Sequence, residues 1–168
     1  MTSEASAGSW VIDPAGSSAT FASKTFWGLM TVRGTFGGVS GSGTFKGDDS
    51  VTGELVIDAT TLNSRNEKRD KHLRSADFFD TDNHPNVVVR VESAKRDGDN
   101  LAGAGTIEAA GRSVPITFTG RVDSTDGEAI ILTASSSVDR HALGMTWNQM
   151  GMLTGLSTGT VTARFVRA

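Results

Sequence analysis

The residues best suited to chemistry lie together between positions 69 and 80. The run reads Arg69-Asp70-Lys71-His72-Leu73-Arg74-Ser75-Ala76-Asp77-Phe78-Phe79-Asp80. An arginine guanidinium can hold a carboxylate or phosphate through two parallel hydrogen bonds. Arg69, His72 and Arg74 would therefore suit a polar or anionic head group at the mouth of a cavity.

The same run has a structural interpretation that the sequence leaves open. In it, Arg69, Asp70 and Asp77 pair with one another and with the backbone of a turn. Leu73 and Phe78-Phe79 then anchor the segment through apolar contacts. Charged runs are usually solvated or paired in this way, so the residue types alone do not assign a binding role.

Histidine is the residue most often recruited to metal sites, and the chain has three of them. His72, His84 and His141 show no recognisable metal-ligand spacing. Residues 80–83 begin like a calcium loop, but Pro85 stands where that loop needs glycine. The sequence therefore predicts no metal site, and no cofactor is expected.

Residues 155–159 match the nucleophile motif G-x-S-x-G letter for letter, with Ser157 at its centre. That motif works at a turn from a strand into a helix. Here an irregular segment precedes it and a strand follows, which indicates a glycine-rich turn. Because the chain has no cysteine, thiolate catalysis and disulfides are excluded. An acid–base pair hidden inside the fold remains open.

A second group of residues is apolar and lies in two segments without a regular period. Methionine adapts to irregular apolar ligands, and concave sites are lined mostly by such side chains. The alternative is that these residues simply fill the core. The group comprises Phe26, Trp27, Leu29, Met30, Met145, Trp147, Met150, Met152, Leu153 and Leu156.

The elements that would position these groups are mostly short strands. Alternating stretches are expected at 10–13, 18–24, 31–36, 39–45, 52–59, 86–96, 101–109, 113–122, 128–139 and 158–166. In one of them Val87, Val89 and Val91 share a face. One helix is expected, from a capping box of Ser64 with Glu67 to about Arg74. Its polarity predicts a flanking position rather than a core one.

Length and composition limit the fold to one domain. The 168 residues include 20 glycines and only three prolines, which favours many strands and tight turns. We expect residues 1–8 to form a disordered tail and residues 9–168 a single all-β domain. The fold class is one antiparallel β-barrel of about eight strands with one short helix, and a two-sheet sandwich is the alternative.

Charge and hydropathy limit the partners. A net charge of −3 disfavours nucleic acid. No apolar run approaches the roughly 20 residues of a membrane span, so none is predicted. No basic, apolar leader is visible at the amino end, which predicts a cytoplasmic location.

In this order the motifs resemble those of the YceI-like family, lipocalin-like barrels associated with polyisoprenoid binding. The resemblance covers nearly all of residues 10–166. It rests on Trp10-Val11-Ile12-Asp13-Pro14, Val32-Arg33-Gly34-Thr35-Phe36, the run from Arg69 to Phe79, His84-Pro85, and Arg140 with Leu143-Gly144-Met145-Thr146-Trp147-Asn148. The middle run is the specific one.

Several positions depart from the family pattern. Gly16-Ser17 stands where members usually have His-Ser, Lys24-Thr25 replaces a pair ending in histidine, and Leu143 replaces phenylalanine. Two histidines near one end of the barrel are therefore missing. The resemblance implies the fold firmly, and it leaves the head group of the ligand open.

The first hypothesis is a carrier or sequestering protein for a long isoprenoid or other apolar small molecule. The residues expected to bind it are Phe26, Trp27, Leu29, Met30, Arg69, His72, Arg74, Phe78, Phe79, Met145, Trp147, Met150 and Leu153. The second hypothesis is a cofactor-free isomerase or cyclase that uses the same cavity and positions an apolar metabolite. The third is an interaction module with the methionine-rich segment as a homodimer interface.

Overall fold

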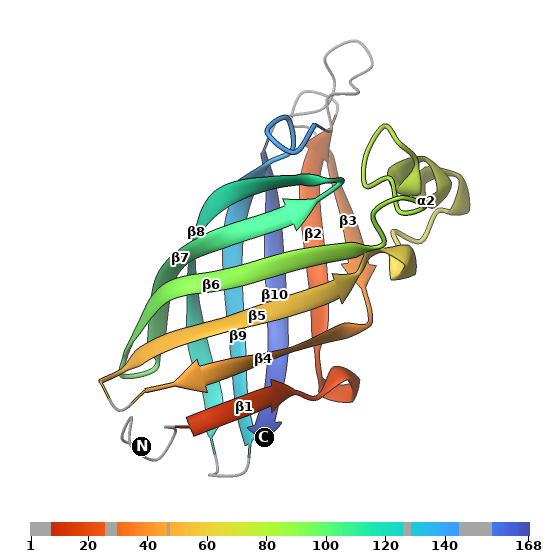
Figure 1. Ribbon diagram of the computed structural model, residues 1–168. Helices are drawn as coiled ribbons and strands as arrows, with labels where there is room; N and C mark the ends of the chain where they lie inside the picture. Colours follow the sequence, from red (N-terminus) through yellow and green to blue (C-terminus); the bar gives the residue numbers. More distant parts are fainter. Residues whose placement is uncertain (1–7, 26–29, 47, 126–128, 145–155) are drawn as a thin grey trace.

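The described part of the protein is mostly β-strand (Figure 1). The computed structural model describes residues 8–25, 30–46, 48–125, 129–144 and 156–168. The strands are β1 Gly8–Ile12, β2 Ser18–Thr25, β3 Met30–Phe36, β4 Val39–Phe45, β5 Ser50–Asp58, β6 Asn86–Asp97, β7 Asn100–Ala109, β8 Arg112–Thr125, β9 Ala129–Asp139 and β10 Leu156–Arg167. The helix α2 spans Glu67–Arg74.

The strands form a closed antiparallel barrel, as predicted. Their order is β1-β4-β5-β6-β7-β8-β9-β10-β2-β3, and β1 also pairs with β10, which closes the ring. β10 shares one edge between two partners: Phe165–Arg167 pair with β1, and Ser157–Thr162 pair with β2. β1 and β2 follow one another along this edge and act as one strand. β3 and β4, which pair with β2 and β1, act as another, so the ten strand segments make a barrel of eight strands.

A short 3₁₀ turn at Pro14–Gly16 separates β1 from β2. Proline cannot donate a ladder hydrogen bond, so pairing is interrupted here and the chain changes direction. Asp13 caps the turn by accepting a hydrogen bond from the Ala15 amide, and its carboxylate contacts Arg164 Nη1 on β10 at 2.6 Å. The 3₁₀ turn is therefore held against β10, the strand that pairs with both β1 and β2.

Alternation places one face of each strand inside the barrel. Val87, Val89 and Val91 of β6 point inward, as their spacing predicted. Bulges in β6 and β8, seen as register shifts in the β5–β6, β6–β7 and β8–β9 pairings, bend the strands and help to close the sheet. The interior is consequently lined by aliphatic and aromatic side chains.

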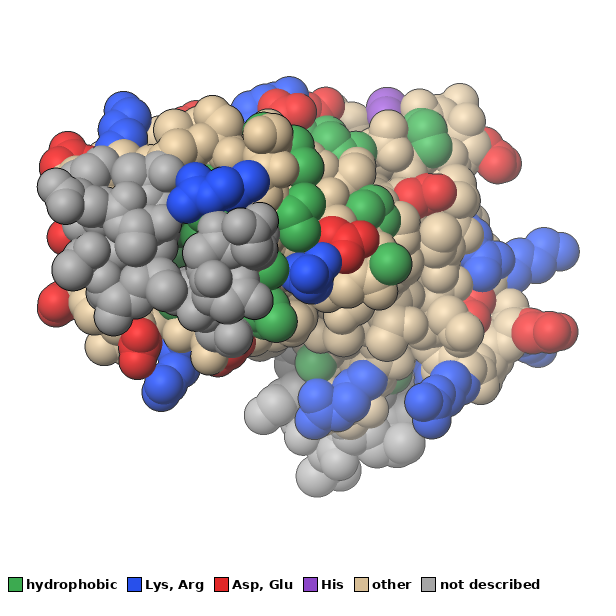
Figure 2. Space-filling view, turned by 90° about the horizontal axis from the view of Figure 1, so that it is seen from below, with side chains coloured by type: hydrophobic (Ala, Val, Ile, Leu, Met, Phe, Trp, Pro, Cys, Tyr) green, Lys and Arg blue, Asp and Glu red, His purple; other side chains and the backbone are tan. Residues whose placement is uncertain are grey.

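One end of the barrel is filled by aromatic residues. Trp10 is 1% exposed and meets Phe45 edge to face, and Phe45 meets Phe165 in the same way. The Arg167 guanidinium stacks over Trp10 at 4.4 Å from the ring centroid. Figure 2, which views the molecule from below, shows positive and negative side chains spread over that side, with hydrophobic ones between them.

Helix α2 lies beside the opposite end of β3 and near the ends of β5 and β6, as the flanking prediction required (Figure 1). The predicted capping box is wrong. Asn66, not Ser64, is the N-cap, and its side chain accepts from the Arg69 amide. Ser64 is buried and donates its amide and hydroxyl to the Asp70 carboxylate instead, so the helix begins at Glu67.

The expected amino-terminal tail, residues 1–8, falls outside the described residues except for Gly8, which begins β1. Among the helices that the structure describes, none combines the length and the apolar character needed to span a lipid bilayer.

Candidate ligand cavity

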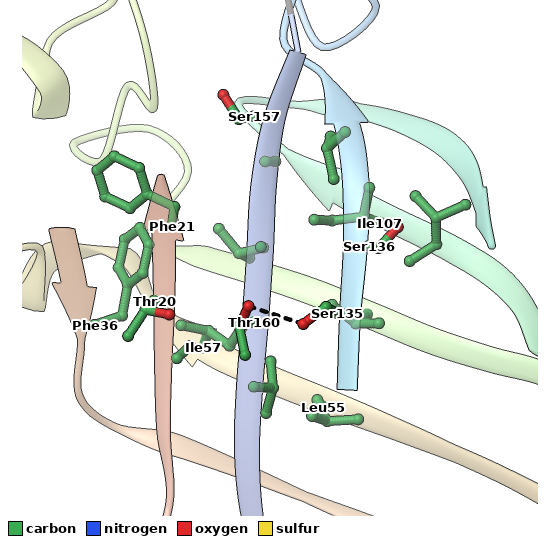
Figure 3. Close-up of a pocket in the computed structure, with 18 of the residues that line it drawn as sticks. Thr20, Phe21, Phe36, Leu55, Ile57, Ile107, Ser135, Ser136, Ser157 and Thr160 are labelled. Carbon is green, nitrogen blue, oxygen red and sulfur yellow. Dashed lines mark hydrogen bonds between the residues drawn. The ribbon is translucent and has the colours of Figure 1, made fainter. Parts of the chain in front are cut away.

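The barrel encloses a cavity of about 990 Å³. Its wall is formed by inward-facing residues of the strands, and α2 contributes one side of its polar end. Figure 3 shows part of this wall, with Phe21 and Phe36 on neighbouring strands at one side and Leu55 and Ile107 at the other. Such a volume with mostly apolar lining is typical of sites for small apolar molecules.

Aromatic rings close the cavity on the side of β2 and β3. Phe21, Phe36 and Phe79 form a cluster with ring centroids 5.5–6.2 Å apart. Phe79 comes from the segment after α2, so this segment is attached to the barrel wall through apolar contacts. Phe78, its neighbour, is buried and also lines the cavity.

Arg69 lines the cavity from α2. Its guanidinium is held by the loop before the helix: Nε donates to Ser64 Oγ at 2.9 Å and Nη2 donates to the Ser64 carbonyl at 2.7 Å. Asp70 accepts from the same serine on the other side. The charge of Arg69 is thus presented at a fixed place beside the cavity.

His72 also lines the cavity and is paired within its own segment. Its Nε2 lies 2.8 Å from Asp77 Oδ2, and the ring of Phe78 meets the imidazole edge to face at 5.2 Å. The Ser75 hydroxyl donates to the His72 carbonyl, which ends the helix. The side chain is about one third exposed, so it stands between cavity and solvent.

Arg74 does not belong to the described cavity lining. Its Nη2 donates to the Leu62 carbonyl at 2.9 Å, which fastens the end of α2 to the chain before it. The charged residues between positions 69 and 80 were expected to pair locally, and they do so with partners other than those expected. Arg69, Asp70 and Asp77 have local partners, yet those partners are Ser64 and His72 rather than one another.

Seven of the predicted apolar contacts lie outside the described residues. These are Phe26, Trp27, Leu29, Met145, Trp147, Met150 and Leu153. For Met30, which begins β3, the backbone is described and the side chain is not. Their role in the site therefore stays a prediction.

The structure adds charged residues to the cavity that were not singled out from the sequence. Lys68 and Lys71 line it from α2, and Arg140 lines it from the end of β9. Arg140 is 6% exposed; burial lowers the pKa of its guanidinium, and the nearby Asp139 opposes that shift. Strand alternation could have indicated an inward position near residue 140, but not that α2 lines the same cavity.

An enzyme that acts in this cavity would need a lining acid or base with a displaced pKa. Among the described lining residues, the group with a displaced pKa is Arg140, which keeps its proton at neutral pH. Within the described ranges, no group of three or more histidine and acidic side chains lies close enough to hold a metal ion.

Known proteins with similar sequences support one family. The YceI-like domain model matches residues 10–165. A protein named YceI from Escherichia coli is 33% identical over 93 residues, which cover 54% of this chain and 49% of the relative. A UPF0312 protein from Enterobacter is 30% identical over the same length. The matched region thus spans about half the length of these curated relatives.

Solved structures share the fold at low sequence identity. BcnA from Burkholderia cenocepacia superposes with a TM-score of 0.80 at 14% identity, covering 91% of this chain and 98% of that one. A polyisoprenoid binding domain from Saccharophagus degradans gives 0.72 at 14% identity, over 95% and 98% of the two chains. Because the family model covers nearly the whole barrel, the chain belongs to the YceI-like family.

Proposed function

We propose that the protein carries or sequesters a long apolar small molecule, a polyisoprenoid or a similar lipid, inside the barrel. The observation that carries this proposal is the cavity of about 990 Å³, whose wall is mostly aliphatic and aromatic. The printed description of the Saccharophagus degradans domain as polyisoprenoid binding supports the same class of ligand, since the two chains share a fold.

The energetics favour a long chain. Each buried methylene contributes about 0.8 kcal/mol, so about fifteen of them contribute on the order of 12 kcal/mol. The cost of association starts at roughly 4 kcal/mol. An extended hydrocarbon can therefore bind tightly through burial alone, without a strong polar contact along its length.

The polar end of the ligand would lie toward α2. The opposite end of the barrel is filled by the aromatic rings of Trp10, Phe45 and Phe165, which offer a ligand apolar contacts. Arg69 and His72 line the cavity at the α2 side. A tail-first orientation places the apolar chain in the barrel and its polar end beside these two residues.

Native mass spectrometry of the purified protein, followed by organic extraction, tests the proposal. We expect a stoichiometric apolar adduct, or uptake of geranylgeraniol added to the emptied protein. A protein that is empty on purification and takes up no geranylgeraniol would contradict the proposal. The same spectrum measures the oligomeric state, for which a homodimer was one hypothesis.

A cavity-filling variant gives the matched control. Gly159 faces the cavity, and a Cβ added to it would meet nothing within 4 Å. Gly159→Leu should therefore fold normally and reduce ligand uptake by occupying the space. Thr158→Leu changes the neighbouring, exposed position on the same strand and should leave uptake unchanged. Equal uptake by both variants would place the ligand elsewhere.

A further inference from the structure

The charged residues that line the cavity differ in sign from the protein as a whole. The chain has a net charge of −3. The described lining nevertheless contains the cations Lys68, Arg69, Lys71 and Arg140 and a single carboxylate, that of Asp77. Asp77 is itself paired with His72. The cavity is therefore surrounded by an excess of positive charge that composition alone would not predict.

These cations gather at one end of the barrel. Lys68, Arg69 and Lys71 lie on α2, beside the end of the barrel away from Trp10. Arg140 follows β9, whose final residues Val138 and Asp139 pair with Ser157 and Leu156 of β10. Arg140 is therefore next to the start of β10, at the end of the barrel away from Trp10. The remainder of the wall is largely aliphatic and aromatic.

Two serine hydroxyls lie on the inner wall at this same end. Ser23 of β2 and Ser157 of β10 are strand partners, and both line the cavity. Their Oγ atoms are 2.5 Å apart, so one hydroxyl donates to the other. That bond uses one of the two hydroxyl protons. The other proton has no acceptor among the described residues and remains available to an oxygen atom in the cavity.

The wall beside this serine pair is open. Gly159 lies two residues after Ser157, on the same inward face, and pairs with Phe21 on one side and Ser136 on the other. Because nothing lies within 4 Å of the position of its missing Cβ, a ligand atom can approach the β10 backbone there. The Ser136 hydroxyl already donates to the Thr117 carbonyl at 2.7 Å, so its proton is engaged.

From the charges, the serine pair and the open wall, we infer that the ligand has an anionic polar end, a carboxylate or a phosphate, bound against Ser23 and Ser157. This inference rests on the proposed function and names the chemistry of the head group. The serine hydroxyl donates to an anionic oxygen, and the surrounding cations supply the favourable field. The hydrocarbon then extends past Gly159 toward the aromatic residues that fill the far end.

Three ligands of equal chain length test the sign of the charge: palmitate, hexadecyl phosphate and hexadecanol. Their affinities are measured by displacement of 1-aminoanthracene from the full chain. We expect one or both anions to bind about tenfold more tightly than the alcohol, and that advantage to shrink as salt is added. If only one of the two anions binds more tightly than hexadecanol, that anion identifies the head group. Equal binding of all three would overturn the inference but leave the proposed function intact.

The double variant Ser23→Ala with Ser157→Ala tests the place of binding. A hydrogen bond to a charged group is strong enough that its loss should weaken anion binding about tenfold. Hexadecanol binding should change less. Ser40→Ala with Ser137→Ala, at two exposed strand positions, is the matched control and should change neither. An anion affinity unaltered by the double variant would overturn the assignment to this pair.

Failure of the two proposals can be told apart. If none of the three ligands displaces the probe and geranylgeraniol is not taken up, the carrier function itself is contradicted. If hexadecanol binds as well as the anions, the cavity holds lipids and the anionic end is wrong. Circular dichroism of each variant establishes that the barrel is folded before affinities are compared.

Discussion

The ring of Phe21 on β2 lies directly over the backbone of Gly34 on β3. The two residues are partners across these antiparallel strands, and a Cβ on Gly34 would overlap the phenylalanine ring. Glycine at this position therefore makes room for an aromatic side chain that also contacts Phe36 and Phe79. This relationship explains the glycine within the motif Val32-Arg33-Gly34-Thr35-Phe36.

Gly34→Ala should destabilise the protein. The added methyl group forces Phe21 away from Phe36 and Phe79, and overpacking of this kind costs about 1–3 kcal/mol. Urea unfolding measures the change. Gly159→Ala is the control, since its new methyl group enters open space and should change the free energy of unfolding by less than about 0.5 kcal/mol. Equal effects of the two substitutions would contradict this account of Gly34.

Asp70→Asn should loosen the attachment of α2. The Asp70 carboxylate is 6% exposed and accepts hydrogen bonds from the Ser64 amide, at 2.8 Å, and the Ser64 hydroxyl. The amide side chain cannot accept both through a charged oxygen, so we expect a loss of about 1–3 kcal/mol in thermal or urea unfolding. Glu67→Gln, at an exposed position of the same helix, should have little effect. A wild-type stability for Asp70→Asn would refute the anchoring role.

Arg167→Ala should weaken the filled end of the barrel. The guanidinium lies 4.4 Å from the centroid of the buried Trp10 ring, a geometry that contributes about 0.5–2 kcal/mol. Arg167→Lys keeps the charge but not the planar stacking and should lose less. The exposed Arg121→Ala provides the control. The urea concentration at the unfolding midpoint ranks the three variants by stability. A loss in Arg121→Ala as large as that in Arg167→Ala would contradict a stabilising role for the stacking.

The pH dependence of Asp48 can be predicted with its sign. The Ser50 hydroxyl, at 2.5 Å, and the Ser50 amide, at 3.1 Å, donate to the carboxylate and lower its pKa below 3.8; Lys95 adds a weaker effect. Because the folded pKa is below the unfolded one, the resulting stability is complete above the unfolded value. It is lost as the pH falls through the folded value.

A carbon NMR titration of Asp48 tests this assignment. Ser50→Ala should raise the titration midpoint toward 3.8, because the strongest donor is removed. Lys95→Gln should raise it less, since the lysine acts only through its charge. A larger shift in the lysine variant than in the serine variant would show that the hydrogen bond is not the main cause.

Local patterns were sufficient for much of the fold. The alternation at Val87, Val89 and Val91 predicted their common inward face, because successive side chains of a strand point to opposite sides whatever the rest of the chain does. The turns and the short, polar helix could also be predicted, because each depends on a few neighbouring residues. The sharing of one strand edge by β1 and β2 could not, since it arises only when β10 is present to pair with both.

The helix start shows where a local pattern was insufficient. Ser64 and Glu67 have the spacing of a capping box, yet Asn66 fits the cap position equally well. Ser64 is instead engaged by the buried carboxylate of Asp70 after the chain turns at Arg65, which has a φ of 63°. Ser64 and Asn66 could each have capped the helix, and the burial of Asp70 against Ser64 leaves Asn66 as the cap.

The sequence by itself determined that this chain is an all-β domain of many short strands, because strand alternation and turn residues act over a few neighbours. It favoured a barrel over a two-sheet sandwich. It also indicated Arg69 and His72 as residues near a cavity. Only the tertiary structure brought Arg140 and the Ser23–Ser157 pair to the end of the barrel beside α2. Ser23 and Ser157 are distant in the chain and meet only across paired strands, so closure of the barrel is the physical cause of their convergence.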